Sequence, residues 1–128
     1  MEITMIFDRH TMFSEDEAVT ATGACALVVD CGPGLHKACT PPNLVVLANG
    51  YTGTGKLDVE LQGCDNLNFA SDVKTLAIFP LTNTELARGG KLLATGIPHT
   101  DKRYLRLKYT VNGTISGGIV NAGLVADA

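Results

Sequence analysis

Two segments of the chain alternate apolar and polar residues with a period of two. In residues 56–62, leucine and valine alternate with charged and amide side chains, and in residues 103–111 every second position from Leu105 to Val111 is apolar or aromatic. This alternation is typical of strands with one face in the core and the other in water. We therefore predict two half-buried strands and assign Tyr109 to the core.

Shorter apolar runs, separated by glycine and proline, predict further strands. Asn112-Gly113 is the strongest hairpin signal, Asn49-Gly50 is a second turn signal, and residues 84–88 form at most one helical turn. The total is about seven or eight short strands without βαβ crossovers, which predicts an all-β sandwich, jelly roll or barrel. The additional strands are predicted at residues 18–22, 24–30, 43–48, 73–79, 91–95 and 114–127.

The first seventeen residues have no clean period and end in the acidic stretch Ser14-Glu15-Asp16-Glu17. This stretch is compatible with a capped helical turn or with an extended arm, and the arm is favoured. We therefore divide the chain into an arm, residues 1–17, and a β domain, residues 18–128. Because the arm is rich in Ile, Met and Phe, it is expected to pack on its own domain or on a partner.

Composition and charge exclude several classes of function. The chain has 128 residues, which is the length of one domain, and a net charge of −3 with 18% charged residues. This balance disfavours nucleic acid and anionic membranes as partners. The sequence has neither a long apolar run nor a basic, signal-like N-terminus, so neither a transmembrane helix nor a secretory signal is expected.

Residues that carry chemistry do not gather into a catalytic pattern. Residues 50–57 resemble a phosphate-binding loop, but Leu57 replaces the hydroxyl residue and a strand follows, which favours a glycine-rich turn. Asp58 and Glu60 lie on the exposed face of a predicted strand, where carboxylates are normally solvated. The three histidines are widely spaced. We expect no enzyme, no cofactor and no metal site.

The four cysteines form no C-x-x-C pair. Zinc sites usually have closely spaced ligand pairs, and Cys25 and Cys31 are too far apart on an extended strand for a disulfide. We expect small buried thiols. A contact between Cys39 and Cys64 stays open.

Several segments, taken in order, resemble the Bordetella-phage-type capsid cement (decoration) proteins of tailed bacteriophages. The resemblance extends over about residues 8–127 and rests on the order and spacing of motifs that are weak individually. The four cysteines and the loop at residues 32–42 depart from the family pattern. The motifs are Phe13-Ser14, Ala18-Val19-Thr20-Ala21-Thr22 leading into Val28-Val29-Asp30, Leu61-Gln62-Gly63-Cys64-Asp65, the segment KRYLRLKYTV at residues 102–111, and Ala122-Gly123-Leu124-Val125-Ala126-Asp127.

The resemblance implies a jelly-roll protein that binds the outside of an assembled icosahedral capsid, and together with the predicted arm it gives a single-domain jelly roll with an N-terminal arm. The implied partners are the major capsid protein, whose neighbouring subunits the protein would bridge, and further copies of the chain. A homodimer is favoured over a trimer. The implied location is the outer capsid surface of the virion, after synthesis in the host bacterial cytoplasm. Nucleic acid, membranes and cofactors are not implied.

We place the interface with the coat protein, or with a second copy of the chain, on two groups of residues. The arm, centred on Phe7 and Phe13, is expected to make the main hydrophobic contact, and charged residues are expected to set the register. Removal of residues 1–17 is then expected to abolish decoration and leave the β domain folded. The candidate residues are Ile6, Phe7, Met12, Phe13, Glu15, Asp16, Glu17, Arg103, Arg106 and Lys108.

Two other classes of function stay open. A carbohydrate-binding or host-adhesion module on the virion surface requires solvent-facing aromatic residues, and the chain offers only Tyr51, Tyr104 and Tyr109. The third of these is assigned to the core. An enzyme of cupin-like architecture requires His and Glu ligands clustered on neighbouring strands, whereas the histidines fall in arm or loop segments.

Overall fold

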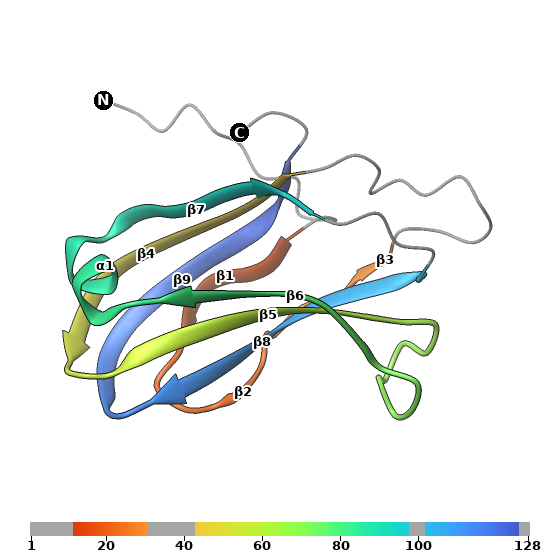
Figure 1. Ribbon diagram of the computed structural model, residues 1–128, viewed down its shortest axis with the longest axis horizontal. Coiled ribbons are helices and arrows are strands. Elements are labelled where there is room, and N and C mark those ends of the chain that lie inside the picture. Colours follow the sequence, from red (N-terminus) through yellow and green to blue (C-terminus); the bar gives the residue numbers. More distant parts are fainter. Residues whose placement is uncertain (1–11, 31–42, 98–101, 126–128) are drawn as a thin grey trace.

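The computed structural model describes residues 12–30, 43–97 and 102–125, which form nine strands and one short helix in two packed sheets (Figure 1). The predicted all-β class is confirmed. The elements are β1 (Met12–Ala18), β2 (Gly23–Ala24), β3 (Val29–Asp30), β4 (Asn43–Gly53), β5 (Lys56–Cys64), β6 (Lys74–Leu81), α1 (Asn83–Arg88), β7 (Gly90–Gly96), β8 (Tyr104–Asn112) and β9 (Ile115–Val125).

The strand order is that of a jelly roll. One sheet has the order β1-β9-β4-β7, the other has the order β2-β8-β5-β6, and β3 also pairs with β8. All pairings are antiparallel. Because β2 and β3 share one partner and one position, the nine strands fill the eight positions of two four-stranded jelly-roll sheets. The sandwich architecture is therefore confirmed, with nine strands in the described residues where about seven or eight were expected.

The core lies between the two sheets and is built from the inward side of each strand. In β8, Leu105 and Leu107 are 0% exposed and Tyr109 is 1% exposed, while the alternate side chains are half-buried on the outer face. This is the alternation that the sequence predicted. Full burial of a leucine or valine side chain stabilises the fold by about 1.5–3 kcal/mol, so these strands hold the sandwich together.

The segment expected to end the N-terminal arm is instead a strand of the sheet. Met12–Ala18 forms β1, which pairs with β9, and Phe13 is 0% exposed in the core. The boundary placed after Glu17 is therefore wrong for residues 12–17. Register shifts on both sides of Ser14 break the period of two, which explains why the sequence pattern did not predict this strand. Ile6 and Phe7 lie outside the described residues.

Hydrogen bonds tie β1 to the opposite sheet. The Phe13 carbonyl accepts from the Leu27 amide at 3.0 Å, and the hydroxyls of Ser14 and Tyr109 lie 2.7 Å apart. The Ser14 hydroxyl donates its one proton to Glu17 at 2.6 Å, so the Tyr109 hydroxyl donates to Ser14. This side of the sandwich is closed by both packing and polar contacts.

On the other side, α1 connects the edge strands β6 and β7 (Figure 1). Its first turn has a capping box, in which the Thr82 hydroxyl accepts from the Glu85 amide and the Glu85 carboxylate accepts from the Thr82 amide. These bonds satisfy backbone groups that a helix start leaves unpaired. The predicted helical turn at residues 84–88 is confirmed.

Two turn predictions had different outcomes. Asn112-Gly113 does connect β8 to β9, with Gly113 at a φ of 93°. Asn49-Gly50, in contrast, lies inside β4 at an irregularity in its pairing with β9, and the strand continues to Gly53.

Two strand predictions also need comment. Residues 19–22, expected to form a strand, lie between β1 and β2. Pro80 lies within β6, which an edge strand tolerates because one of its sides has no ladder partner.

Candidate functional site

The buried residues of β1 cannot serve as a surface contact of the folded protein. Met12 is 7% exposed, and Phe13 is enclosed by core residues of both sheets. A hydrophobic interface on these two side chains is therefore excluded for the folded domain, and we assign Phe13 to the core. Glu15 and Asp16 of the same strand are exposed to solvent.

Asp16 and Glu17 of β1 make side-chain hydrogen bonds within the domain. Asp16 has a φ of 47°, its amide donates to Asn121 Oδ1 at 2.8 Å, and its carboxylate accepts from Asn121 Nδ2 at 3.1 Å. Glu17 Oε1 accepts from the Ala26 amide at 3.0 Å as well as from Ser14. Both side chains thus fasten β1 to its neighbours, a role that the sequence did not indicate.

The three basic candidates lie along β8 and the residue before it. Arg103 makes a bidentate ion pair with Asp30, with N–O distances of 2.9 and 3.0 Å. Its guanidinium carbon lies 5.0 Å from the centre of the Tyr104 ring. The hydrogen bond to Asp30 raises the pKa of Arg103. Arg106 and Lys108 belong to the half-buried outward positions of β8. Arg106 and Lys108 therefore lie on the outer face of this sheet, and Arg103 lies at the start of β8 beside Asp30 and Tyr104.

This face is a mixed-charge surface rather than a basic one. Lys108 is directly opposite Glu60 in the register of β5 and β8. The pKa of Glu60 is lowered, chiefly by a hydrogen bond from the Thr75 hydroxyl. A hydrogen bond from Gln62 and the positive charges of Lys108 and Arg106 lower it further. Opposite charges paired across strands stabilise the sheet modestly. The acidic stretch of β1 lies in the other sheet, so the two charged groups form separate surfaces.

Cys25 is a buried thiol that links β2 to β8. Its Sγ donates to the Leu27 carbonyl at 3.0 Å and accepts from the Leu107 amide at 3.2 Å. Burial raises the pKa of Cys25 from 9.0 to about 11, and burial also raises the pKa of Tyr109 above its usual range. Cys25 and Cys64 are free and buried, whereas Cys31, Cys39 and all three histidines lie outside the described residues.

Alkaline pH is therefore expected to destabilise the protein. Between pH 9 and pH 11 the unfolded chain has released the Cys25 proton and the native state has kept it, so the free energy of unfolding falls as the pH rises. The part due to this thiol is on the order of 2–3 kcal/mol, and Tyr109 adds to the loss. Urea unfolding across this pH range should show a shallower fall for Cys25→Ala. Identical pH profiles for both proteins would contradict this account.

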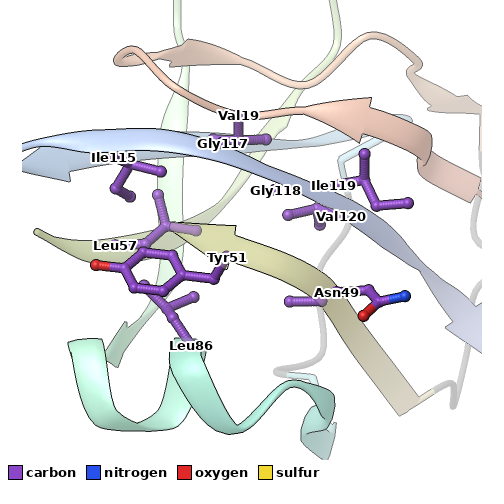
Figure 2. Close-up of a pocket in the computed structure, with 11 residues that line it drawn as sticks. Val19, Asn49, Tyr51, Leu57, Leu86, Ile115, Gly117, Gly118, Ile119 and Val120 are labelled. Carbon is purple, nitrogen blue, oxygen red and sulfur yellow. The ribbon is translucent and has the colours of Figure 1, made fainter. Parts of the chain in front are cut away.

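A small apolar cavity lies beside α1, between β4 and β9 (Figure 2). Its volume is about 20 Å³, close to that of a single water molecule. Leu86 of α1 and the ring of Tyr51 form part of its wall, and the Tyr51 hydroxyl donates to the Gly55 carbonyl at 2.6 Å. A space this small is a packing defect and is far below the size of a ligand site.

The near-match to a phosphate-binding loop is a turn. Residues 50–57 form the end of β4, a tight connection and the start of β5, and the amides of Thr54 and Gly55 donate to the Thr114 carbonyl at 3.0 and 2.8 Å. These two amides therefore already have an acceptor, and a strand follows instead of the helix that a phosphate-binding loop requires. The predicted glycine-rich turn is confirmed.

Within residues 12–30, 43–97 and 102–125, no three His, Cys, Asp or Glu side chains come together as metal ligands. The same ranges contain no helix that is long and apolar enough to cross a membrane. The tyrosines do not gather either, because Tyr51 lines the cavity near α1, Tyr104 contacts Arg103, and Tyr109 is in the core.

The loop at residues 65–73 connects β5 to β6, and the sequence pattern assigned no candidate site to it. It exposes Leu67 at 60% and buries Phe69 to 7% beneath the guanidinium of Arg106. The contact between Arg106 and Phe69 connects distant parts of the chain, so no local pattern could predict it. The one available signal was a pair of large apolar residues two positions apart within a polar run.

These features define a small jelly-roll protein. The described part of its surface carries charged residues on β1 and β8 and an exposed leucine, Leu67, on the loop at residues 65–73. The chain belongs to the Bbp16 family, whose model matches residues 13–124. The family is named for a Bordetella phage protein, which is consistent with a phage-derived protein and with the phage association expected from sequence. No curated protein matches the chain.

Proposed function

We propose that the protein is a capsid cement protein, which binds the outer surface of an assembled icosahedral phage capsid and bridges neighbouring coat subunits. The observation that carries the proposal is membership of a phage-associated family over nearly the whole described domain, residues 13–124. The fold supports it, because a closed sandwich with a filled core offers a rigid body with two separate charged surfaces.

In this role the protein acts by repetition rather than by catalysis. Each copy binds the assembled shell and not the separate coat subunits, so binding stabilises the assembled form by mass action. Copies that contact two coat subunits, or that associate as dimers, add their contacts through a high effective concentration. The interface then requires rigid surfaces and modest contacts, and no cofactor or catalytic residue takes part.

The surfaces that support this role are the exposed part of β1 and the mixed-charge face of the other sheet. Glu15 and Asp16 present acidic groups on the first surface. Arg106 and Lys108 carry cations of the second surface, and Arg103 lies next to β8 in the ion pair with Asp30. Charges of both signs on a rigid sheet favour orientation-specific docking, because complementary charges set the register and suppress wrong arrangements.

Sedimentation tests the proposal. Purified protein is mixed with capsids of its phage that lack it, or with unassembled coat subunits, and both mixtures are separated on a gradient. We expect the protein to travel with the capsids in a fixed ratio to coat subunits, to leave free subunits unbound, and to raise the temperature at which the shells disrupt. A folded protein that stays at the top of the gradient would refute the proposal. Binding in a glycan screen would then favour host adhesion.

A further inference from the structure

The loop at residues 65–73 is longer than the usual connection between two neighbouring antiparallel strands. It joins β5 and β6, which are neighbours in one antiparallel sheet, and two to five residues are usual for such a hairpin. In Figure 1 the loop extends beyond the end of the sheet, on the right of the view. It contains Leu67 and Val73, two of the three large hydrophobic residues that are exposed in the described part of the chain.

A network of contacts holds this loop in one shape. At its start, the Asp65 carboxylate accepts from the Arg103 amide at 3.1 Å and lies 3.6 Å from Lys102 Nζ. The thiol of Cys64 accepts from the Asn66 amide at 3.4 Å and donates to the Ser71 carbonyl at 3.0 Å, which ties the two ends of the loop together.

Phe69 anchors the middle of the loop on the sheet. Its side chain is 7% exposed, the Arg106 guanidinium lies 4.3 Å from its ring, and its amide donates to the Asn66 carbonyl at 3.0 Å. Arg106 is in turn held by Gln62, whose Oε1 accepts from Arg106 Nε at 2.8 Å. The loop thus packs on the outer face of the sheet through one aromatic ring.

These contacts hold two residues of the loop in an unfavourable backbone conformation. Phe69 has a φ of 54° and Asp72 a φ of 58°, in a region that residues other than glycine rarely adopt. A bulky residue such as phenylalanine is a marked outlier there, and such strain persists only where the surroundings enforce it. The chain therefore keeps a long, strained surface loop rigid, and that rigid loop holds a leucine out in the solvent.

We propose that this loop is a preformed docking element, in which Leu67 enters an apolar hollow on the outer surface of the assembled coat shell. The inference rests on the proposed function and names the part of the molecule that makes the contact. Because the loop is already ordered, binding requires little loss of conformational freedom. Residues 65–73 carry no cation, and of their two carboxylates Asp65 is paired with Lys102 whereas Asp72 is exposed. A cation at the rim of the coat hollow, opposite Asp72, would therefore complement the loop.

The test compares two substitutions at matched exposure. Leu67 is 60% exposed on the loop and Ile78 is 58% exposed on β6, so either residue can be replaced by serine without opening the core. Binding of each variant to undecorated capsids is measured by titration and gradient sedimentation. Circular dichroism and thermal unfolding confirm that the variants fold. We expect Leu67→Ser to weaken binding about tenfold or more, and Ile78→Ser to change it less than about twofold.

Each outcome decides the inference. Selective loss of binding by Leu67→Ser supports the docking loop. Unchanged binding by Leu67→Ser, or an equal loss in both variants, overturns it and leaves the cement role standing, because the wild-type protein still binds. Failure of the wild-type protein to bind capsids overturns the proposed function and this inference together.

Discussion

Replacing Phe13 with alanine is expected to lower the free energy of unfolding by about 3–5 kcal/mol. The Phe13 ring is 0% exposed and packs in the core between the sheets, so its removal leaves a cavity in addition to the lost burial. Urea unfolding followed by circular dichroism measures the change. Ala18→Ser is the matched control, because Ala18 is exposed on the same strand and the change should alter stability by less than about 0.5 kcal/mol.

This prediction separates a core role of β1 from an interface role. If Phe13 contacted a partner, Phe13→Ala would keep its stability and lose capsid binding, which would contradict the assignment to the core. Because β1 belongs to the sheet, removal of residues 1–17 is no longer expected to leave the β domain folded. That deletion takes most of β1 with it, exposes the edge of β9, and is therefore expected to destabilise the domain itself.

Substitution of Gly53 by alanine is expected to destabilise the protein by about 1–3 kcal/mol or more. Gly53 has a φ of 127°, and a Cβ atom there would lie 2.4 Å from the Thr114 carbonyl oxygen. The backbones of the β4–β5 and β8–β9 connections meet at this point, so neither side can move away without breaking hydrogen bonds to Thr114. Thermal and urea unfolding measure the effect.

Gly23→Ala is the control for Gly53→Ala. A Cβ atom at Gly23 would meet nothing within 4 Å, and no positive φ opposes the substitution. Its stability is therefore expected to stay within about 0.5 kcal/mol of the wild-type value. Equal stability of both alanine variants would show that the close approach of the two connections does not restrict Gly53 in solution.

The sequence predicted the parts of the fold that depend on local pattern. The period of two in β8 and the Asn112-Gly113 turn are properties of neighbouring residues, and both are present. The strand β1 was missed because its acidic run suggested solvent and its pairing with β9 shifts register twice. Asn49-Gly50 has the composition of a turn, but its pairing with β9 determines that it lies inside a strand.

The candidate surfaces were predictable to a similar degree. The outward orientation of Arg106 and Lys108 followed from their positions in β8, which a period of two assigns directly. The partner of Arg103 could not be predicted, because Asp30 and Arg103 are far apart in the chain. The strained Phe69 under Arg106 depends on the same kind of long-range contact. Motif order, in contrast, indicated a phage family correctly across most of the chain.

Cryo-electron microscopy of decorated capsids tests the cement role most directly. Capsids that lack the protein are imaged before and after addition of the purified, folded protein. The account predicts added density of jelly-roll shape at symmetry-related positions on the outer shell, with each copy touching neighbouring coat subunits. Its symmetry would also distinguish a dimer from a trimer. Identical maps with and without the protein would contradict the account.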